Sequence, residues 1–528
     1  MLEAFWIPLL PPFFLGLLLS WAVECLLLPR PAAPWRRPWA ANFTHLGVWL
    51  IAFALELALF RRPYFAVANV LAIQLVIILV SRAKYQALQE PFVYPDFEYF
   101  TDAIKHPRLY LPFLGWWGAL AAAGGYGLAL WLGLAFEEPV AGRAISPGES
   151  LPTGFLLPKA SLLLFYLTVI GLSALALLLV WRAGRWLTAE FDADTDLQRM
   201  GLMASLWAYA RAERAPFEFP RQSTSFSIGT THAGLPDLVC IQSESFFDAR
   251  QAYDLVKSDV LAAFDRICSE GVAYGRLNVA ARGANTVRTE FSFFSGLSSD
   301  ELGVHQYNPY RRLARQGGLE TLPKRLRGLG YRTICVHPYY GAFYRRDRVL
   351  PLLGFDELID IKEFSAKDKA GAYVSDRALA AYVSRLLEVD DGAPRYIHVI
   401  TMENHGPLHW EKVTDEDARN VLTKPLPTDC EDLVAYLRHL RNADAMFDEL
   451  RSTLLKNNRP SGLCIFGDHV PIMPKVYSLL GPVSGTSNYV VWTNRLPTPK
   501  VGRQDMADNE LASFFFGVTV LGKNRHLV

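Results

Sequence analysis

Five long apolar runs within the first 181 residues constrain the fold of this chain more than any other feature. A helix needs about 20 apolar residues to cross a bilayer. The first run and the last two reach that length, and the middle two reach it by extending into their flanks. A cluster of buried core helices is the alternative, but a globular core needs fewer such runs. We predict an N-terminal transmembrane domain, residues 1–181, of about five spans: 5–28, 43–60, 65–80, 109–136 and 160–181.

The overall composition agrees with a membrane-embedded part. Hydrophobic residues make up 51% of the 528 residues and aromatic residues 13%, with a mean hydropathy of +0.13. This much apolar surface excludes a disordered chain. The net charge is +1, so the chain lacks the bulk charge of a polyanion-binding protein, and we expect no nucleic-acid partner. The six cysteines show no CxxC spacing and predict neither a zinc knuckle nor a dense disulfide scaffold.

The loop charges do not assign one side of the membrane. Basic residues follow the first and third runs, among them Arg36, Arg37, Arg82 and Lys84. If positive loops stay inside, an odd number of spans puts everything after the fifth span in the cytoplasm. The chemistry of the second half favours the opposite side. The first run lacks a basic segment before it and a small-residue cleavage site, which predicts a retained anchor.

The pattern changes after about residue 190. We predict a juxtamembrane connector, residues 182–235, in which Thr195–Arg214 is helical and lies either on the bilayer or against the following domain. Residues 236–528 alternate short apolar runs with amphipathic segments, which predicts an α/β domain with a mostly parallel sheet and helices on both faces. The expected strands are 238–241, 332–336, 396–401, 463–466 and 489–492, and the expected helices are 249–267, 319–329, 375–387 and 431–455.

Polar residues follow four of the expected strands at the point where each strand ends. The four runs lead to Glu244, His337, His405 and the pair Asp468-His469. In open α/β sheets, ligands bind outside the carboxyl ends of the strands. Two carboxylates and an imidazole suit manganese, magnesium or zinc, and no thiolate of a structural zinc site is present. We therefore expect one divalent cation at this edge, although each residue taken alone could be an ordinary loop side chain.

The segment that begins at Gly283 contains a candidate nucleophile. The residues after Gly283, through Leu297, read as a helix, and Thr286 lies near its start. The positive end of a helix dipole favours an alkoxide or a phosphate there. A cation bound to the hydroxyl would activate it further for attack. The alternative is that Thr286 or Asn285 only caps the helix.

Over roughly residues 236–520 these motifs resemble the alkaline phosphatase/sulfatase superfamily, and more narrowly the lipoteichoic acid synthase family of membrane phosphoglycerol transferases. The resemblance implies about five N-terminal spans and an extracytoplasmic catalytic domain. It also implies one manganese ion held by Glu244 in Ser-Glu-Ser, Thr286 in Asn-Thr-Val-Arg-Thr-Glu-Phe, and Asp468 and His469 in Phe-Gly-Asp-His.

Two further segments resemble the substrate-binding parts of that family. His337-Pro-Tyr-Tyr-Gly-Ala-Phe-Tyr-Arg-Arg-Asp resembles the headgroup loop and implies substrate contacts from His337, Tyr344 and Arg346. Thr401-Met-Glu-Asn-His405 resembles the segment that supplies a second substrate-binding histidine. The chain departs from the family at Tyr344, where the family has Trp, and in the Val-Arg that follows Thr286. Both departures bear on the headgroup or the acceptor.

The function implied by the resemblance is a two-step phosphodiester transfer. Thr286 takes glycerophosphate from phosphatidylglycerol, and an acceptor hydroxyl then receives it with His405 or His337 handling the proton. The expected acceptor is an envelope glycan or a polyglycerolphosphate chain, and the expected location is the bacterial plasma (inner) membrane, multi-pass, with the catalytic domain extracytoplasmic or periplasmic. A sulfatase activity is not expected, because no Cys-x-Pro-x-Arg or Ser-x-Pro-x-Arg motif is present.

Two alternatives remain open from the sequence. One is a different enzyme on the same scaffold, either a phosphoethanolamine transferase or a phosphodiesterase. The other is a non-catalytic membrane protein that binds glycans or partners. A metal site with a nucleophile beside it argues against the second alternative, because a binding module has no use for a nucleophile.

Overall fold

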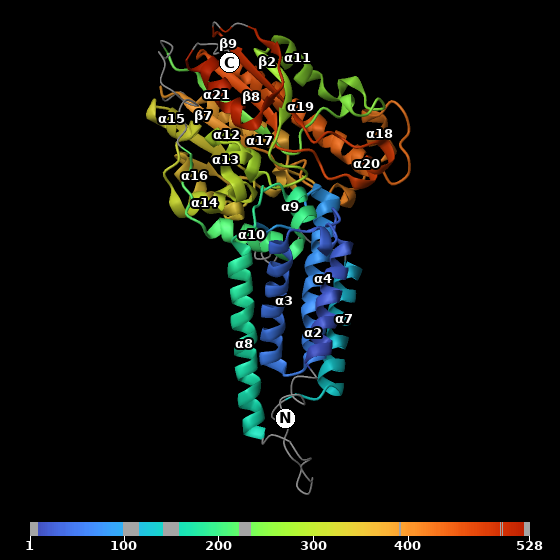
Figure 1. Ribbon diagram of the computed structural model, residues 1–528. Helices are drawn as coiled ribbons and strands as arrows, with labels where there is room; N and C mark the ends of the chain where they lie inside the picture. The colour runs from blue at the N-terminus through green and yellow to red at the C-terminus, as the bar shows by residue number, and fades with distance from the viewer. Residues whose placement is uncertain are drawn as a thin grey trace. The chain divides into compact units, whose positions relative to one another are not determined.

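The computed structural model of the chain describes residues 9–98, 116–140, 158–220, 234–389, 392–496, 498 and 500–521. The chain forms two compact units, Met1–Pro216 and Phe217–Val528. The first unit is helical and the second is built around a β-sheet (Figure 1).

The described residues of unit 1 form five apolar helices that run alongside one another (Figure 1). α3 packs against α8 and α4, and α4 also contacts α2 and α7. Trp49 and Phe53 lie in the buried interior of this bundle, whereas Leu18, Leu59 and Ile170 are each more than 60% exposed. An apolar exterior of this kind is expected of helices that face lipid. The helices are α2 (Leu10–Val23), α3 (Trp39–Phe60), α4 (Pro63–Leu88), α7 (Trp116–Phe136) and α8 (Pro158–Gly184).

Three stretches among the described residues are long and apolar enough to cross a membrane, fewer than the five spans predicted. They are Trp39–Phe60, Pro63–Leu88 and Ser161–Gly184, by length and composition. Leu10–Leu26 and Gly124–Phe136 form shorter apolar helices. The predicted first and fourth runs begin at residues 5 and 109, and their initial segments, 5–8 and 109–115, lie outside the described residues.

The segment predicted as helical at 195–214 forms two helices. α9 (Ala193–Met200) is capped by the Asp192 carboxylate, which accepts a hydrogen bond from the Thr195 amide, and α10 (Leu202–Arg214) follows directly. Gly201 separates the two helices with a positive φ of 77°. A Cβ at Gly201 would lie 2.1 Å from Arg37, so both the backbone conformation and the close approach require glycine there.

Unit 2 is built on a nine-stranded sheet of order β10-β2-β9-β8-β1-β7-β3-β4, with β11 pairing to β2. The central strands are parallel: β1 lies between β7 and β8, and β3 between β7 and β4. β9 is antiparallel to both of its neighbours, β8 and β2. The strands are β1 (Asp237–Ser243), β2 (Ala273–Asn278), β3 (Arg332–Val336), β4 (Glu357–Ile359), β7 (Arg395–Ile400), β8 (Ser461–Gly467), β9 (Ser487–Asn494), β10 (Gly502–Arg503) and β11 (Met506–Ala507).

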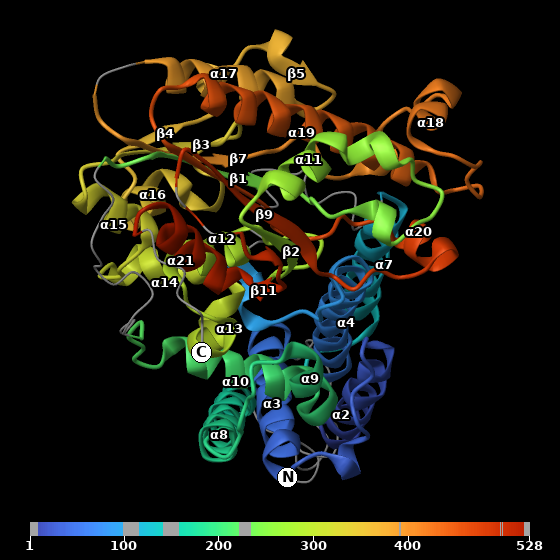
Figure 2. The ribbon, with the colours of Figure 1, turned by 90° about the horizontal axis from the view of Figure 1, so that it is seen from above.

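Each face of the sheet is covered by its own group of helices and has its own apolar core. Alternate residues of β1 enter opposite cores: Val239 and Ile241 join one, and Leu238 and Cys240 the other. The first core lies under α11 (Ala262–Glu270), α17 (Asp376–Glu388) and α19 (Glu431–Lys456), and the second under α12 (Val287–Ser295), α14 (Pro309–Gln316), α15 (Leu322–Gly328), α16 (Arg346–Leu353) and α21 (Asp508–Thr519) (Figure 2). The prediction of a mostly parallel α/β sheet with helices on both faces is confirmed.

One predicted helix is wrong over most of its length. In the segment 249–267, only the part from Ala262 onward belongs to an α-helix, and the rest forms two short 3-10 helices joined by turns and a single β-bridge residue. Asp248 caps the first turn by accepting from the Arg250 amide, and Val256 forms a β-bridge with Leu422. These contacts to neighbouring and distant residues replace the helical hydrogen bonds.

Candidate active site

The four strands predicted to carry site residues are neighbours and run in the same direction. The order β8-β1-β7-β3 and the parallel pairing bring their carboxyl ends to one edge of the sheet. Glu244 follows β1, His337 follows β3, His405 lies five residues after β7, and Asp468 and His469 follow β8. Each of these four loops therefore begins at the same edge.

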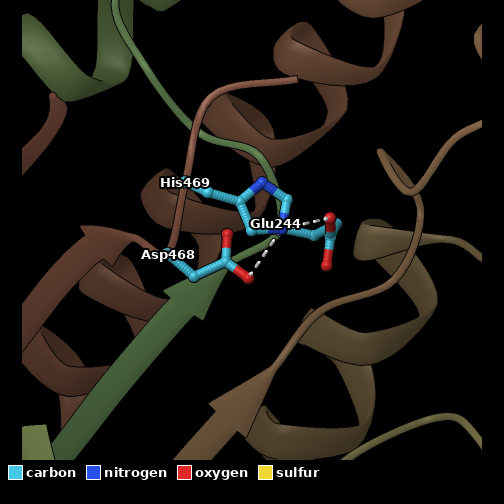
Figure 3. Close-up of side chains that lie close together, drawn as sticks. All are labelled: Glu244, Asp468 and His469. Carbon is cyan, nitrogen blue, oxygen red and sulfur yellow. Dashed lines mark ion pairs between the residues drawn. The ribbon is translucent and has the colours of Figure 1, made fainter. Parts of the chain in front are cut away.

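Glu244, Asp468 and His469 form a tight buried group, here called the metal corner (Figure 3). One potential ligand atom from each residue lies within 4.8 Å of the others. His469 Nε2 is 3.4 Å from Glu244 Oε1 and 3.5 Å from Asp468 Oδ2. All three side chains are at most 3% exposed. Ligand atoms that bind one ion at about 2.1 Å lie roughly 3–3.5 Å apart, so the spacing fits a cation.

Ser245 holds all three members of the metal corner in place. Its amide donates to Asp468 Oδ1 at 2.9 Å, and its hydroxyl donates to Glu244 Oε1 at 2.8 Å. The same hydroxyl lies 3.3 Å from His469 Nδ1, which also donates to the Val470 carbonyl at 3.2 Å. Because Nδ1 carries the proton, the Nε2 lone pair of His469 is available on the side of the two carboxylates.

The metal corner leaves buried acceptor atoms without partners. Asp468 Oδ2 and His469 Nε2 are both fully buried and take part in no hydrogen bond among the described residues. Burial, together with the charge of Asp468, raises the pKa of Glu244 to about 8. Buried acceptors of this kind are costly unless a donor or a cation compensates them. The donor set, two carboxylates and one imidazole, therefore fits a divalent cation.

The backbone around the metal corner is fixed by contacts with other loops. The Thr401 hydroxyl, at the end of β7, accepts a hydrogen bond from the Glu244 amide at 2.9 Å. Gly467 precedes Asp468, and a Cβ at this position would lie 1.9 Å from the Phe246 carbonyl oxygen. Only glycine permits this approach, which brings the Asp468 loop against the Glu244 loop.

Thr286 occupies the position directly before α12. Its residue is 8% exposed, and its side chain makes no capping hydrogen bond to the helix. Three residues later, the Thr289 hydroxyl donates to the Asp468 carbonyl at 2.8 Å, which ties the first turn of α12 to the metal corner. Asn285 precedes Thr286 with a positive φ of 65°. The Thr286 hydroxyl is thus a buried group at a helix start with no capping role.

Arg346 lies in a second buried cluster, here called the arginine cluster. Its guanidinium donates to both carboxylate oxygens of Glu290, at 3.2 and 2.7 Å, and to His337 Nε2 at 3.1 Å. The Tyr310 hydroxyl also donates to Glu290. Arg346 can only donate, so His337 Nε2 must accept, and its protonated Nδ1 donates to the Ile400 carbonyl at 3.3 Å.

The arginine cluster fixes His337 as a neutral residue. Burial and the neighbouring Arg346 charge hold the pKa of His337 well below its usual value. Both of its ring nitrogens are already engaged, so His337 is badly placed to exchange a proton with a substrate. Of the two histidines considered from the sequence, His405 is the better proton carrier.

Tyr344 lies beside Arg346 in the loop predicted to bind the headgroup. The Arg346 guanidinium carbon is 5.4 Å from the Tyr344 ring centroid. Tyr344 and Arg345 both adopt left-handed backbone conformations, with φ of 53° and 56°. Non-glycine residues in this region are strained and concentrate where geometry serves a function.

His405 is partly buried and keeps one ring nitrogen for chemistry. Its Nδ1 donates to the Gly406 carbonyl at 2.8 Å and lies 3.3 Å from the Tyr373 hydroxyl. This assignment leaves Nε2 as the basic nitrogen. Burial lowers the pKa of His405, and the Gly406 hydrogen bond opposes that shift. His405 is therefore neutral near pH 7 and able to accept a proton.

Sequence reasoning missed two residues of this region. Ser245 follows Glu244 directly, and its left-handed φ of 55° turns the chain so that its amide and hydroxyl face the metal corner. Glu290 lies four residues after Thr286, one helical turn along α12, and pairs with Arg346. A carboxylate next to a candidate nucleophile was the available signal for Glu290.

Comparison with known proteins agrees with this architecture. A family model described as Sulfatase matches residues 236–521. The chain belongs to the sulfatase family. This confirms the resemblance to the alkaline phosphatase/sulfatase superfamily. The chain is also 30% identical over 456 residues to the capsular polysaccharide biosynthesis protein RkpI of Rhizobium meliloti (strain 1021). The aligned region covers 82% of this chain and 78% of RkpI.

Solved structures resemble this sulfatase-family chain as well. The integral membrane protein lipooligosaccharide phosphoethanolamine transferase A (EptA) from Neisseria meningitidis matches 92% of this chain and 96% of its own, with a TM-score of 0.54 and 12% identity. The lipoteichoic acid synthase LtaP from Listeria monocytogenes matches 56% of this chain and 74% of its own, with a TM-score of 0.44 and 19% identity. The EptA match shows a shared fold that includes the N-terminal unit.

Proposed function

We propose that this protein transfers glycerophosphate from phosphatidylglycerol to an envelope glycan or a polyglycerolphosphate chain, through a phospho-threonine intermediate at Thr286. The observation that carries the proposal is the metal corner, in which Asp468 Oδ2 and His469 Nε2 make no hydrogen bond among the described residues, and which Thr289 connects to α12, directly after Thr286. The name of the relative RkpI, a capsular polysaccharide biosynthesis protein, supports a glycan acceptor.

Glu244, Asp468 and His469, together with Thr286, would hold one divalent cation. We propose Mn²⁺, with Mg²⁺ or Zn²⁺ as alternatives that the same donor set accepts. When bound, the cation would lower the pKa of the threonine hydroxyl and offset negative charge that develops on phosphate. The chain itself holds these ligands in position through Ser245 and Thr401.

The reaction proceeds in two displacements at phosphorus. Thr286 Oγ forms a bond to phosphorus, the bond to the diacylglycerol oxygen breaks, and diacylglycerol leaves with a proton. An acceptor hydroxyl then attacks the glycerophospho-threonine, and the bond between phosphorus and Thr286 Oγ breaks. His405 Nε2 accepts the proton of the incoming hydroxyl, and Thr286 Oγ regains a proton, so the enzyme returns to its starting state. Arg346 is held by Glu290, and its remaining N–H groups would donate hydrogen bonds to the headgroup. Tyr344 and His337 would contact the headgroup beside it.

We further propose that the N-terminal unit spans the bacterial plasma membrane about five times and that unit 2 lies outside the cytoplasm. A tethered site meets a lipid donor that diffuses in two dimensions more often than a free one. Reporter fusions after Arg250 and after Arg143 test the placement. A reporter active only after export should be active at Arg250 and inactive at Arg143, and the reverse pattern would refute an extracytoplasmic catalytic unit.

The decisive experiment incubates the purified protein with fluorescent phosphatidylglycerol and Mn²⁺. Diacylglycerol should form, and mass spectrometry should find glycerophosphate on the peptide that contains Thr286. A phosphoethanolamine adduct from phosphatidylethanolamine, without a glycerophosphate adduct, would instead show that this protein transfers phosphoethanolamine, the group in the name of EptA. Release of the headgroup to water without any adduct would indicate a phosphodiesterase. Absence of both products would leave only a non-catalytic role.

A further inference from the structure

A second concave site lies in unit 2 among α11, α17, α18 (Asp415–Val421) and α19. This cavity, here called the α19 pocket, has a volume of 460 Å³, within the usual range for ligand sites. Its lining is mostly polar, and α19 contributes Arg438, Arg441 and Asn442 along one side. Neither the metal corner nor the arginine cluster contributes a side chain to it.

The lining of the α19 pocket is rich in polar groups whose formal charges are balanced. Four arginines and four aspartates line it, so their formal charges cancel. A polyanion would meet the aspartates and a polycation the arginines, and both would bind poorly. Guanidinium, carboxylate and amide groups lie side by side in the wall, and some already pair with one another, as Arg266 does with Asp448 and Arg438 with Asp417. Sugar hydroxyls both donate and accept, which matches such a lining.

The pocket is connected to the loop of His405 through Glu403. Asn442, which lines the pocket, donates to Glu403 Oε1 at 2.5 Å. The Asp376 amide donates to Glu403 Oε2 at 2.6 Å, and the next residue, Arg377, also lines the pocket. Glu403 is 1% exposed and lies two residues before His405 in the chain.

A third connection runs through an imidazole. Arg438, on the pocket wall, donates to Glu411 Oε2 at 2.6 Å. His439 joins that carboxylate to Glu403, at 2.8 Å through Nε2 and 3.0 Å through Nδ1. Glu403 therefore contacts one pocket-lining residue, Asn442, directly, and it contacts Asp376 and His439, the chain neighbours of two others. A shift of these wall residues would therefore change the position of Glu403 and of the loop that leads to His405.

We propose that the α19 pocket binds neutral sugar residues of the acceptor glycan, and that Glu403 links its occupancy to the position of His405. The inference rests on the proposed function, because it assigns the acceptor side of that reaction. Of the two proposed acceptors it favours a neutral glycan, because a polyglycerolphosphate chain would bring negative charge close to the pocket aspartates. The pocket thus separates acceptor recognition from the donor site at the metal corner.

The test uses the full-length protein in detergent, with a ladder of neutral glucan oligosaccharides as acceptors. The variant Arg377→Met/Arg441→Met removes two exposed guanidinium groups from the pocket rim. We expect the acceptor KM to rise at least about tenfold, with a smaller change in kcat, since the change affects binding more than the displacement. The matched control is Arg276→Met, an exposed arginine on β2, which should leave the acceptor KM unchanged.

Direct binding separates the outcomes. Calorimetric titration with the oligosaccharides alone, without lipid, should show binding to the wild type and to Arg276→Met, and at least tenfold weaker binding to the double variant. Equal affinity in all three proteins, or no binding to the wild type, would overturn the pocket assignment. If the wild type binds the oligosaccharides but forms no diacylglycerol from phosphatidylglycerol, the proposed function fails while the glycan site stands.

Discussion

Two buried polar groups in unit 2 have opposite electrostatic character. The arginine cluster is complete: the Arg346 guanidinium, the Glu290 carboxylate and the His337 ring satisfy one another, and the charges cancel. The metal corner is incomplete: two carboxylates and an imidazole face each other, and two of their ligand atoms have no hydrogen bond within the described part of the chain. Both groups are equally buried, so exposure does not explain the difference.

The difference shows which group is prepared for a ligand. A satisfied ion pair in the interior stabilises a particular arrangement and gains little from a further charge. An unsatisfied set of acceptors is unfavourable until a cation completes it, so the free energy of binding is available there. The arginine cluster therefore stabilises a fixed local arrangement, and the metal corner is the site expected to bind the cation. The four predictions below test this distinction.

The first prediction concerns Thr286, which lies directly before α12 and is proposed to complete the metal corner. Thr286→Ala should lower transfer by roughly 10³-fold or more, because it removes the attacking oxygen. The free energy of unfolding should fall by less than about 1 kcal/mol, since the side chain makes no capping hydrogen bond. Thr286→Ser keeps a hydroxyl and should retain more activity. Residual transfer by Thr286→Ala above a tenth of the wild-type rate would remove Thr286 as the nucleophile.

The second prediction concerns the charge of the metal corner. Asp468→Asn should weaken Mn²⁺ binding at least about 100-fold. Mutation of residues that only hydrogen-bond to a metal ligand already lowers metal affinity by about 10–100-fold. Transfer should be lost with it, and a chelator should silence the wild type. Calorimetry with Mn²⁺ measures the affinity. Glu357→Gln, at an exposed carboxylate, is the control and should bind Mn²⁺ normally. Activity after thorough chelation, with no bound metal, would show that this group is not a metal site.

The third prediction breaks the complete group. Glu290→Gln leaves the Arg346 charge buried without a partner and should cost about 3–5 kcal/mol of unfolding free energy. The double variant Glu290→Gln/Arg346→Met removes both charges and should recover more than half of that loss. Urea unfolding of the purified full-length protein, followed by tryptophan fluorescence, measures both. Equal losses in the single and double variants would show that the pair does not compensate as inferred.

The sequence predicted those parts of the site that depend on local pattern. Each strand that directly precedes Glu244, His337 or Asp468 is a short apolar run, and parallel pairing alone brings their ends together. The same reasoning could not find the partners of these residues. Ser245 and Asp468 are separated by 223 positions, and Glu290 and Arg346 by 56, so their pairing depends on the fold of distant segments.

The fold shows the same division between local and long-range information. The four central strands and α19 were predicted because their apolar periodicity is strong. β2 was missed because the segment Ala-Tyr-Gly-Arg-Leu-Asn is half exposed, contains a glycine and is defined by its pairing with β9. The helix predicted at 249–267 failed because a capped turn at Asp248 and a bridge from Val256 to Leu422 replace its hydrogen bonds.

The fourth prediction has the smallest expected effect and applies the same distinction to His439. Both ring nitrogens of His439 donate to carboxylates, Nδ1 to Glu403 and Nε2 to Glu411, so the imidazole is held as a cation. Arg438, which also pairs with Glu411, and Asp376, which lies beside Glu403, are the other charged groups that face it. Burial alone would lower the pKa of His439, but the two carboxylates outweigh it and raise the pKa to about 9.

A histidine with a pKa higher in the folded state than in the unfolded chain stabilises the fold fully below the unfolded value of 6.5 and loses that contribution as the pH rises to about 9. His439→Gln should therefore cost up to about 3 kcal/mol at pH 6, and the cost should shrink between pH 6.5 and 9. Urea midpoints of both proteins, measured from pH 6 to 9.5, give the comparison. His409→Gln, at a histidine outside this group, should follow the wild-type curve. If the His439→Gln and wild-type curves run parallel across that range, His439 is not held as a cation, and the Glu403 carboxylate must be compensated in another way.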